Sequence, residues 1–558
     1  MSGELSYIPH PLDERRLDLG PWQAFERSLA RFLQHGGYKD VKVVGGTGDG
    51  GADIVASLNG KRCLVQAKYR SSGSVGKDAV KEAYDAMWLY EAETAIAATN
   101  IRFSKEAKSF CQDKINAGFD LKLWDRDFLL QYSKELSEES AAKINLRDYQ
   151  NEAVETVLNS YLDNNKKSFI TLATGLGKTV IASTILSEII KIKPEAKILV
   201  LAHMNDLVKQ LEQSSWPQLM STTHTHLWAD GEKPAFEDGV TFATWQSLNS
   251  AIENGLYLKN MFDVIIVDEA HHAASPSFVK LINELNASFL FGLTATPWRG
   301  DGFSLRPIFG DPVFSMDIVE GMQKGFLADV DYKMFVDGID WEDISSLSKQ
   351  GLTVKDLNTK LLMPERDLGI IETIQNTIKE IKEPRVLVFC RSIVHAERLK
   401  NYFAQYDIPA GILHSDISRS DRFLTLTNFR NGNLSVLISI EMLNEGIDVP
   451  EVNMVVFARV THSRRIFLQQ LGRGLRLTDN KKSVIVLDFV ADVRRLAAAV
   501  EINNEAKKYI GETEIIRYPD GEIVNFSSQS GSFFHEYLAD MANISDLDED
   551  SKLQFPPV

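Results

Sequence analysis

The sequence predicts an α/β protein with an N-terminal α/β domain, two parallel-sheet domains and a small C-terminal appendage. The chain has 558 residues, too many for one core when a domain holds about 100–200 residues. Apolar runs of strand length alternate with helical patterns in residues 146–329 and again in residues 370–493, which is typical of parallel sheets covered by helices. Residues 20–132 carry a hairpin signal instead, which indicates a domain of a different kind.

The N-terminal domain is predicted to begin with a helix whose apolar residues recur at helical spacing, namely Trp22, Phe25, Leu29, Phe32 and Leu33. Two strand-like runs follow at residues 52–58 and 61–69. Asn59-Gly60 joins them and is the strongest short signal for a hairpin. A polar stretch at residues 133–143 indicates a linker, which we expect to separate this domain from the rest.

The two later blocks each contain apolar runs of buried-strand length, at residues 168–173, 196–202 and 262–268, and at residues 385–390, 435–440 and 484–489. The expected division of the chain is an N-terminal domain at 1–132, a linker at 133–145, a first parallel-sheet domain at 146–335, an inter-domain segment at 336–369, a second parallel-sheet domain at 370–495, and an appendage with an acidic tail at 496–558.

Composition excludes several classes of protein. The three cysteines lie far apart without CxxC spacing, which excludes a zinc ribbon and a disulfide framework. No apolar run approaches the roughly 18 residues of a membrane span, and the N-terminus lacks a secretory pattern, so we expect a cytoplasmic protein without membrane contact. The formal net charge of −16 neither supports nor excludes a nucleic-acid partner, because affinity depends on local basic patches.

Residues 172–179 have the pattern of a phosphate-binding loop, because they lie between a predicted strand and a long predicted helix. Backbone N–H groups around Thr174, Gly175 and Gly177 would surround phosphate oxygens. Lys178 would neutralise charge on the β and γ phosphates, and Thr179 would reach Mg²⁺. A chance glycine-rich turn is the alternative, and the flanking strand and helix speak against it.

A pair of carboxylates, Asp268 and Glu269, follows the buried run at residues 262–267. Burying such a pair is costly unless the charges are used. Asp268 is the expected Mg²⁺ ligand, and Glu269 is the expected base that polarises the attacking water. His272, beside His271, is interpreted as a packing or surface residue.

Together these segments resemble a superfamily 2 helicase of the DEAH/Res type, the group that includes the motor subunits of restriction enzymes. The matching segments are residues 146–150, 172–179, 268–271, 294–296, 445–450 and 469–476. The resemblance covers residues 146–490 and implies a RecA-like fold for both blocks. It implies that Gln150 contacts the adenine and that Gly446 and Asp448 belong to the nucleotide site.

The resemblance also implies why two blocks are needed. Arg473 and Arg476 of the second block would reach the γ-phosphate when the domains close, and such arginines contribute on the order of 10³–10⁵ in rate. The segments that grip the nucleic-acid strand match less well. In residues 201–207, Met204 stands where arginine is frequent, and backbone phosphate contacts are expected at Thr244, Arg391 and Ser439.

The N-terminal hairpin places three polar residues on one face. If Asn59-Gly60 is the loop, Asp53 lies opposite Gln66, and Lys68 projects on the same side. Glu26 lies at the border of the apolar stripe of the preceding helix. Such a set suits metal-dependent phosphodiester hydrolysis, in which Asp53 and Glu26 hold Mg²⁺ and Lys68 stabilises the attacking hydroxide or the phosphate.

This arrangement resembles the PD-(D/E)XK nuclease fold in its Mrr-like branch, over about residues 20–132. The resemblance rests on Glu26, residues 50–55, residues 65–68 and residues 73–77. It implies a restriction-endonuclease-like domain with Glu26, Asp53, Gln66 and Lys68 as catalytic residues. Gln66 replaces the second carboxylate of the broader pattern, so Mn²⁺ is an alternative to Mg²⁺. A hairpin with ordinary surface polar residues is the opposing interpretation.

These features predict an ATP-dependent DNA helicase or translocase fused to a metal-dependent endonuclease that acts in restriction of foreign DNA. The expected substrate is double-stranded DNA, with single-stranded DNA as a second substrate and further subunits as partners. Three alternatives stay open: a repair or recombination factor, a DNA-sensing motor whose nuclease fold only binds DNA, and an RNA remodeller.

Overall fold

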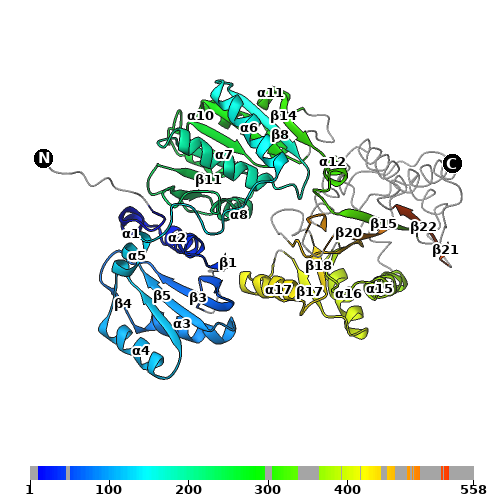
Figure 1. Ribbon diagram of the computed structural model, residues 1–558, viewed down its shortest axis with the longest axis horizontal. Helices are drawn as coiled ribbons and strands as arrows, with labels where there is room; N and C mark the ends of the chain where they lie inside the picture. Colours follow the sequence, from blue (N-terminus) through cyan, green and yellow to red (C-terminus); the bar gives the residue numbers. More distant parts are fainter. Residues whose placement is uncertain are drawn as a thin grey trace.

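The computed structural model describes residues 10–44, 51–295, 304–336, 364–390, 392–414, 416–440, 449–458, 474–477, 481, 483–490, 517–518 and 521–526. Within this part the chain forms a five-, a seven- and an eight-stranded sheet, together with a small two-stranded one. Figure 1 shows the three large sheets as three separate bodies, with α1 and α2 lying between the first and the second. In the described part, no helix is long and apolar enough to cross a membrane.

The N-terminal domain is a mixed sheet in the order β1-β2-β3-β5-β7. Strands β1, β2 and β3 are antiparallel neighbours, and β3, β5 and β7 are parallel. The strands are β1 (Lys39–Val43), β2 (Ile54–Leu58), β3 (Lys61–Lys68), β4 (Ser74–Val75), β5 (Thr94–Thr99), β6 (Arg102–Phe103) and β7 (Asp120–Trp124). The helices are α1 (Glu14–Leu19), α2 (Trp22–His35), α3 (Lys77–Leu89), α4 (Lys105–Asn116) and α5 (Arg126–Ser133).

The predicted hairpin register is confirmed, since Leu58 pairs with Lys61 and Ile54 pairs with Val65. The two faces of the hairpin have different neighbours. Ile54 and Val65 pack with the apolar residues of α2, whereas the alternating residues Val55 and Leu64 pack with those of α3 and α4. Each helix layer therefore covers one face of the sheet.

RecA-like domain 1 is a parallel sheet in the order β10-β11-β9-β12-β13-β8-β14. Its strands are β8 (Lys167–Leu172), β9 (Ile198–Ala202), β10 (Thr225–Trp228), β11 (Val240–Thr244), β12 (Val264–Val267), β13 (Phe289–Thr294) and β14 (Pro312–Met316). Its helices are α6 (Asp148–Leu162), α7 (Lys178–Ile192), α8 (Asn205–Ser215), α9 (Trp245–Glu253), η1 (Ala270–Ala274), α10 (Pro276–Leu285), α11 (Arg306–Phe309) and α12 (Ile318–Gln323). Because all strands are parallel, the segments that follow them meet at one edge of the sheet.

RecA-like domain 2 is an eight-stranded sheet in the order β17-β18-β16-β19-β20-β15-β22-β21. Its strands are β15 (Asp329–Val336), β16 (Val386–Cys390), β17 (Ala410–Leu413), β18 (Val436–Ile440), β19 (Met454–Phe457), β20 (Ser483–Val490), β21 (Arg517–Tyr518) and β22 (Gly521–Phe526). Its described helices are α15 (Pro364–Ile378), α16 (Ile393–Gln405) and α17 (Arg419–Asn431). The buried runs of β16, β18 and β19 form its centre.

Two predicted boundaries are wrong here. The first parallel-sheet domain was expected to extend to residue 335, but β15 pairs with β20 along its whole length, from Asp329 opposite Ser483 to Val336 opposite Val490. The expected separate appendage at 496–558 contributes β22, which pairs antiparallel with β15. Both strands thus belong to the sheet of RecA-like domain 2, because strand pairing satisfies their backbone hydrogen bonds there.

The N-terminal domain docks directly on RecA-like domain 1. Arg27 on α2 donates hydrogen bonds to Glu212 at 2.6 Å and to both carboxylate oxygens of Glu232 at 2.7 and 2.6 Å. All three side chains are at most 8% exposed. Burial opposes the charged form of Arg27, but the two carboxylates outweigh burial and raise the pKa of this guanidinium. Arg27 is therefore held as a cation between the domains.

Further buried contacts extend this interface. Arg16 donates to the carbonyl oxygen of Thr225 at 2.8 Å, and Arg31 donates to the carbonyl oxygen of Met220 at 2.6 Å. The two ring nitrogens of His224 lie 2.7 Å from Asp13 and 2.9 Å from Asp238. These bonds join α1 and α2 to the segment around β10, so the interface is a network of charges and not a loose contact.

The expected linker at 133–145 also lies against RecA-like domain 1. Its first residue, Ser133, belongs to α5. The carbonyl oxygen of Glu138 accepts a hydrogen bond from the backbone of Ser221 at 2.7 Å, and Gln218 bonds both backbone groups of Ile144 at 3.0 Å. The stretch thus connects the two domains along the chain while it packs against RecA-like domain 1, and α1 and α2 bridge the domains as well.

Candidate ATP site and nuclease centre

The phosphate loop lies between β8 and α7. Helix α7 begins at Lys178, and its cap Gly177 has φ 85 and ψ 37, the left-handed region that glycine adopts without strain. A Cβ at Gly177 would lie 2.5 Å from Nε2 of Gln150, so a larger residue would displace the Gln150 side chain. Thr174, Gly175, Lys178 and Thr179 are partly exposed. The N-terminus of α7 is therefore accessible beside the loop, as a phosphate site requires.

Gln150 holds this loop from the side of α6. Its Nε2 donates to the carbonyl oxygen of Leu176 at 3.0 Å, and its Oε1 accepts from the backbone N–H of Arg147 at 3.0 Å. The Tyr149 hydroxyl donates to the same Leu176 carbonyl at 2.7 Å. The segment matched to adenine recognition therefore contacts the phosphate loop directly.

Glu269 faces Lys178 across the site. The two side chains, 14% and 11% exposed, approach to 3.7 Å between Glu269 Oε1 and Lys178 Nζ. Lys178 Nζ also lies 3.4 Å from the carbonyl oxygen of Leu172. Glu269 has φ 47, a conformation that a residue with a Cβ adopts only under constraint. Asp268 precedes it directly after β12 and is partly exposed, so both acids lie at the end of the strand as predicted.

His271 connects the acid pair to β13. Its Nδ1 lies 3.3 Å from Glu269 Oε2 and 3.1 Å from the hydroxyl of Thr294, and its side chain is 1% exposed. The sequence indicates His271 only as part of residues 268–271, and no pattern in it predicts this link. His272 stacks on His203 with ring centroids 3.9 Å apart, which confirms its interpretation as a packing residue.

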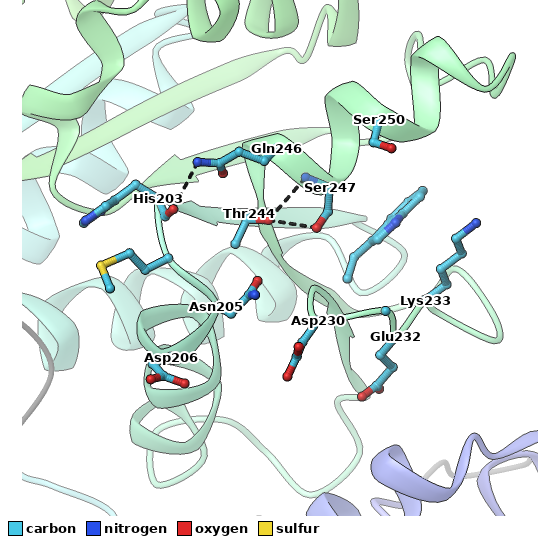
Figure 2. Close-up of a pocket in the computed structure, with 13 residues that line it drawn as sticks. His203, Asn205, Asp206, Asp230, Glu232, Lys233, Thr244, Gln246, Ser247 and Ser250 are labelled. Carbon is cyan, nitrogen blue, oxygen red and sulfur yellow. Dashed lines mark hydrogen bonds between the residues drawn. The ribbon is translucent and has the colours of Figure 1, made fainter. Parts of the chain in front are cut away.

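A pocket of about 780 Å³ opens at the edge where β9, β10 and β11 end (Figure 2). Its lining residues come from the ends of β10 and β11, the loops after β9 and β10, the start of α8, and α9. They are His203, Met204, Asn205, Asp206, Trp228, Asp230, Gly231, Glu232, Lys233, Thr244, Gln246, Ser247 and Ser250. The structure thus brings together the two predicted strand-gripping regions around Met204 and Thr244. The wall at residues 228–233 was not predicted, and its Glu232 is the partner of Arg27.

Part of the site predicted in RecA-like domain 2 lies outside the described residues, namely Arg391, Gly446, Asp448 and Arg473, as does Thr296 of domain 1. Arg476 is described and forms a β-bridge with Leu327. Burial raises the pKa of Tyr149, and the positive charges of Arg147 and Arg476 counteract that rise. The ring of Phe326, the residue before Leu327, lies 4.4 Å from the ring of Tyr149 between centroids, so the segment that Arg476 bridges contacts the segment of Gln150. Ser439 is fully buried in β18.

The predicted nuclease residues Asp53, Gln66 and Lys68 share one face of the N-terminal sheet. Asp53 is 6% exposed and Gln66 is 4% exposed. Oδ2 of Asp53 accepts the backbone N–H of Ala67 at 2.7 Å, which fixes the carboxylate beside β3. Lys68 is partly exposed and pairs with Glu82 of α3 at 2.8 Å. The structure brings these three predicted residues together and adds Glu82, which no sequence motif indicated.

Glu26 belongs to a different layer. Helix α2, which carries Glu26, packs on the face formed by Ile54 and Val65. Gln66 alternates with Val65 and therefore projects from the opposite face, toward α3. Helix α2 and the face of Asp53 and Gln66 thus lie on opposite sides of the sheet, and the role of Glu26 as a metal ligand stays a prediction.

The residues on the α3 face fit a divalent cation. Oε1 of Gln66 is buried and has no hydrogen-bond partner in the described part of the chain. An amide oxygen of this kind, beside the carboxylate of Asp53, matches the oxygen ligands that Mg²⁺ and Mn²⁺ prefer. Among the described residues, no group of three or more His, Cys, Asp or Glu side chains could hold a metal. The fit therefore depends on the amide oxygen as well as on carboxylates.

Comparison with known families agrees with this division. Residues 17–132 match the restriction endonuclease family of the Mrr catalytic type. Residues 143–299 match the family described as type III restriction enzyme, res subunit, and residues 369–478 match the helicase conserved C-terminal domain.

Two curated relatives illustrate the range of similar proteins. A type I restriction enzyme EcoAI endonuclease subunit of Escherichia coli is 26% identical over 374 residues, covering 62% of this chain and 46% of that protein. The DNA 3'-5' translocase XPB2 of Sulfurisphaera tokodaii is 29% identical over 383 residues, covering 62% of this chain and 82% of that protein. The matched part of this chain corresponds to 51%, 59% and 46% of the full length of three curated relatives, the EcoAI subunit being the third.

Among solved structures, the ATP-dependent Type ISP restriction-modification enzyme LlaBIII bound to DNA has a similar fold. The TM-score is 0.52 at 18% identity, covering 95% of this chain and 39% of that chain. Along the chain, the nuclease family comes first and the two helicase families follow, in the same order as the three domains of the structure. The chain joins a restriction endonuclease domain of the Mrr type to a two-domain helicase of the DEAH/Res type, and it is related to restriction enzyme subunits.

Proposed function

We propose that this protein is an ATP-dependent DNA translocase or helicase that works together with its own metal-dependent endonuclease in restriction of foreign DNA. The observation that carries the proposal is the direct docking of the N-terminal domain on RecA-like domain 1 through the buried Arg27 network. A nuclease fixed to a motor in this way is carried along with it. The related EcoAI protein is named as a subunit, and we propose partner subunits here as well.

The geometry of the ATP site supports hydrolysis. Lys178 neutralises the β and γ phosphates, while Thr179 and Asp268 hold the Mg²⁺ that accompanies the nucleotide. Glu269, 3.7 Å from Lys178, orients the attacking water. Gln150 reads the adenine, and Gly446 and Asp448 complete the nucleotide site from domain 2. Arg473 and Arg476 reach the γ-phosphate when the two RecA-like domains close.

The pocket at the ends of β9 and β11 supports strand binding. Asn205, Thr244 and Ser247 provide polar side chains along one wall (Figure 2). Hydroxyl and amide groups of this kind commonly contact phosphate oxygens of a nucleic-acid backbone. We propose that one DNA strand passes through this pocket, beside the wall that holds the nuclease domain.

The nuclease centre supports hydrolysis of a phosphodiester. A divalent metal held by Asp53 and Gln66, with Glu26 as a further predicted ligand, would supply a water of lowered pKa as nucleophile. Lys68 stabilises the negative charge that develops on the phosphate. Mg²⁺ and Mn²⁺ are both candidates. All three cysteines are buried and no disulfide joins them, which suits a reducing compartment, so we propose that the protein acts in the cytoplasm.

The decisive experiment measures ATPase and DNA cleavage together on modified and unmodified plasmid DNA, with Mg²⁺ and with Mn²⁺. We expect ATPase stimulated by duplex DNA more than by RNA, and cleavage that depends on modification. Cleavage of both plasmids alike would remove the restriction role and favour repair. ATPase without any cleavage, under either metal, would leave a DNA-sensing motor.

A further inference from the structure

The nuclease centre has fewer carboxylates than metal-dependent hydrolysis of DNA usually employs. Asp53 carries one negative charge, and Gln66 beside it carries none. Yet Gln66 is 4% exposed and its Oε1 has no partner in the described residues. A buried acceptor without a donor is costly, so this oxygen marks a place where a ligand is expected.

A second carboxylate stands at the same face. Helix α3 covers the side of the sheet from which Gln66 and Lys68 project. From this helix Glu82 reaches Lys68, with Oε2 of Glu82 2.8 Å from Nζ of Lys68. The two side chains are 46% and 35% exposed, so an exposed ion pair of this kind adds little stability by itself. Stability therefore does not explain why a carboxylate stands there.

The backbone at Gly51, two residues before Asp53, packs closely against Glu82. Gly51 has φ 91, and a Cβ at this position would lie 2.9 Å from the carbonyl oxygen and 3.3 Å from the Cβ of Glu82. Only glycine permits this approach at that φ. The chain therefore enters β2 close to Glu82, and Asp53 follows two residues later.

We propose that Glu82 is a metal ligand of the nuclease centre and supplies the carboxylate that Gln66 does not. The centre then combines the carboxylates of Asp53 and Glu82, the neutral oxygen of Gln66 and the ammonium group of Lys68. This inference rests on the proposed nuclease function and names a residue on α3 where the sequence analysis named Glu26 on α2. A carboxylate on the helix layer compensates for one missing from the strand.

The proposal predicts how metal binding depends on charge. Replacing Glu82 by Gln keeps the size of the side chain and removes one anion from the centre. We expect Mn²⁺ affinity to fall about 10- to 100-fold, the range typical when a group that supports a metal site is lost. Affinity is measured by electron paramagnetic resonance of free Mn²⁺ on the full chain without nucleotide, which keeps the ATP site from contributing.

A rescue variant tests whether charge is the cause. In Glu82→Gln, a second change Gln66→Glu returns one carboxylate to the same face. We expect this double variant to recover most of the lost Mn²⁺ affinity and of DNA cleavage. Asp113→Asn is the control, because Asp113 is an exposed carboxylate of the neighbouring helix α4, and it should bind Mn²⁺ as the unmodified protein does.

The outcomes separate the inference from the function on which it rests. If the unmodified protein binds Mn²⁺ and cuts DNA, and Glu82→Gln does both equally well, Glu82 is not a ligand while the nuclease function stands. If Glu26→Gln weakens binding as predicted for Glu82→Gln, and Glu82→Gln does not, the carboxylate comes from α2. If the unmodified protein neither binds Mn²⁺ nor cuts DNA, both proposals are overturned.

Discussion

At the phosphate loop, the chemistry depends on individual side chains that the backbone holds in unusual positions. Gly177 adopts a left-handed conformation directly before Lys178, and Glu269 does so directly after Asp268. The two left-handed residues set the ends of α7 and of β12 so that Lys178 and Glu269 meet at 3.7 Å. Glycine adopts this conformation without strain, whereas strain at a residue with a Cβ such as Glu269 is usually maintained because it serves the site.

The first prediction concerns this pair. Lys178→Ala removes the cation from the β and γ phosphates, and Glu269→Gln removes the base that orients water. We expect each variant to lose ATP turnover by roughly 10²-fold or more, because positioned acid–base groups contribute about 10²–10⁴. Steady-state ATPase with saturating DNA measures the effect, and circular dichroism checks the fold. Normal turnover in folded Lys178→Ala protein would refute the ATP site.

At the scale of elements, α2 has two functions that the sequence does not separate. Its apolar stripe packs on the N-terminal sheet, while Arg27 on the same helix inserts between Glu212 and Glu232 of RecA-like domain 1. Glu232 also lines the pocket proposed for the DNA strand. Helix α2 therefore joins the nuclease sheet to the wall of the motor pocket.

The second prediction tests this junction. Arg27→Met leaves two buried carboxylates without their cation, a change that typically costs about 3–5 kcal/mol. We expect urea to unfold the variant at a clearly lower concentration. Arg102→Met is the control, since Arg102 and Asp127 form an exposed pair at 3.9 Å that is worth about 0–1 kcal/mol. Equal losses in the two variants would show that the buried network does not hold the domains together.

At the scale of the whole molecule, ATP hydrolysis depends on the approach of the two RecA-like domains. Arg476 in domain 2 forms a bridge with Leu327, and the backbone N–H of Ala328 donates to the carbonyl oxygen of Leu475 at 2.8 Å. The ring of Phe326, the residue before Leu327, packs on Tyr149 of domain 1 with centroids 4.4 Å apart. The segment that carries Arg476 is therefore connected to the nucleotide side of domain 1.

The third prediction follows from this connection. Arg476→Ala should reduce DNA-stimulated ATP turnover by about 10³-fold or more, the contribution typical of an arginine finger. Binding of ATP should weaken much less, because the arginine acts on the γ-phosphate only when the domains close. Turnover is compared with the dissociation constant of a fluorescent ATP analogue. Equal losses in turnover and in binding would argue that Arg476 contacts the nucleotide at rest.

The sequence by itself determined the features that depend on neighbours along the chain. Glycines before Lys178 predicted the turn into α7, and Asn59-Gly60 predicted the register that places Asp53 beside Gln66. Strand alternation then predicted the common face of Gln66 and Lys68. Each of these follows from backbone geometry within one turn, one hairpin or one strand.

The tertiary structure decided the features that depend on distant segments. In the sequence, Arg27 looks like an ordinary polar residue on the surface of a helix. Only the fold brings Glu212 and Glu232, 185 and 205 residues away, into contact with it. Strand β15 joins the second sheet only because β20 and β22 pair with it. Glu82 belongs to no motif, and only the packing of α3 on the sheet brings it to Lys68. Burial and pairing between remote segments leave no local pattern, because neither partner alone shows which surface will cover it.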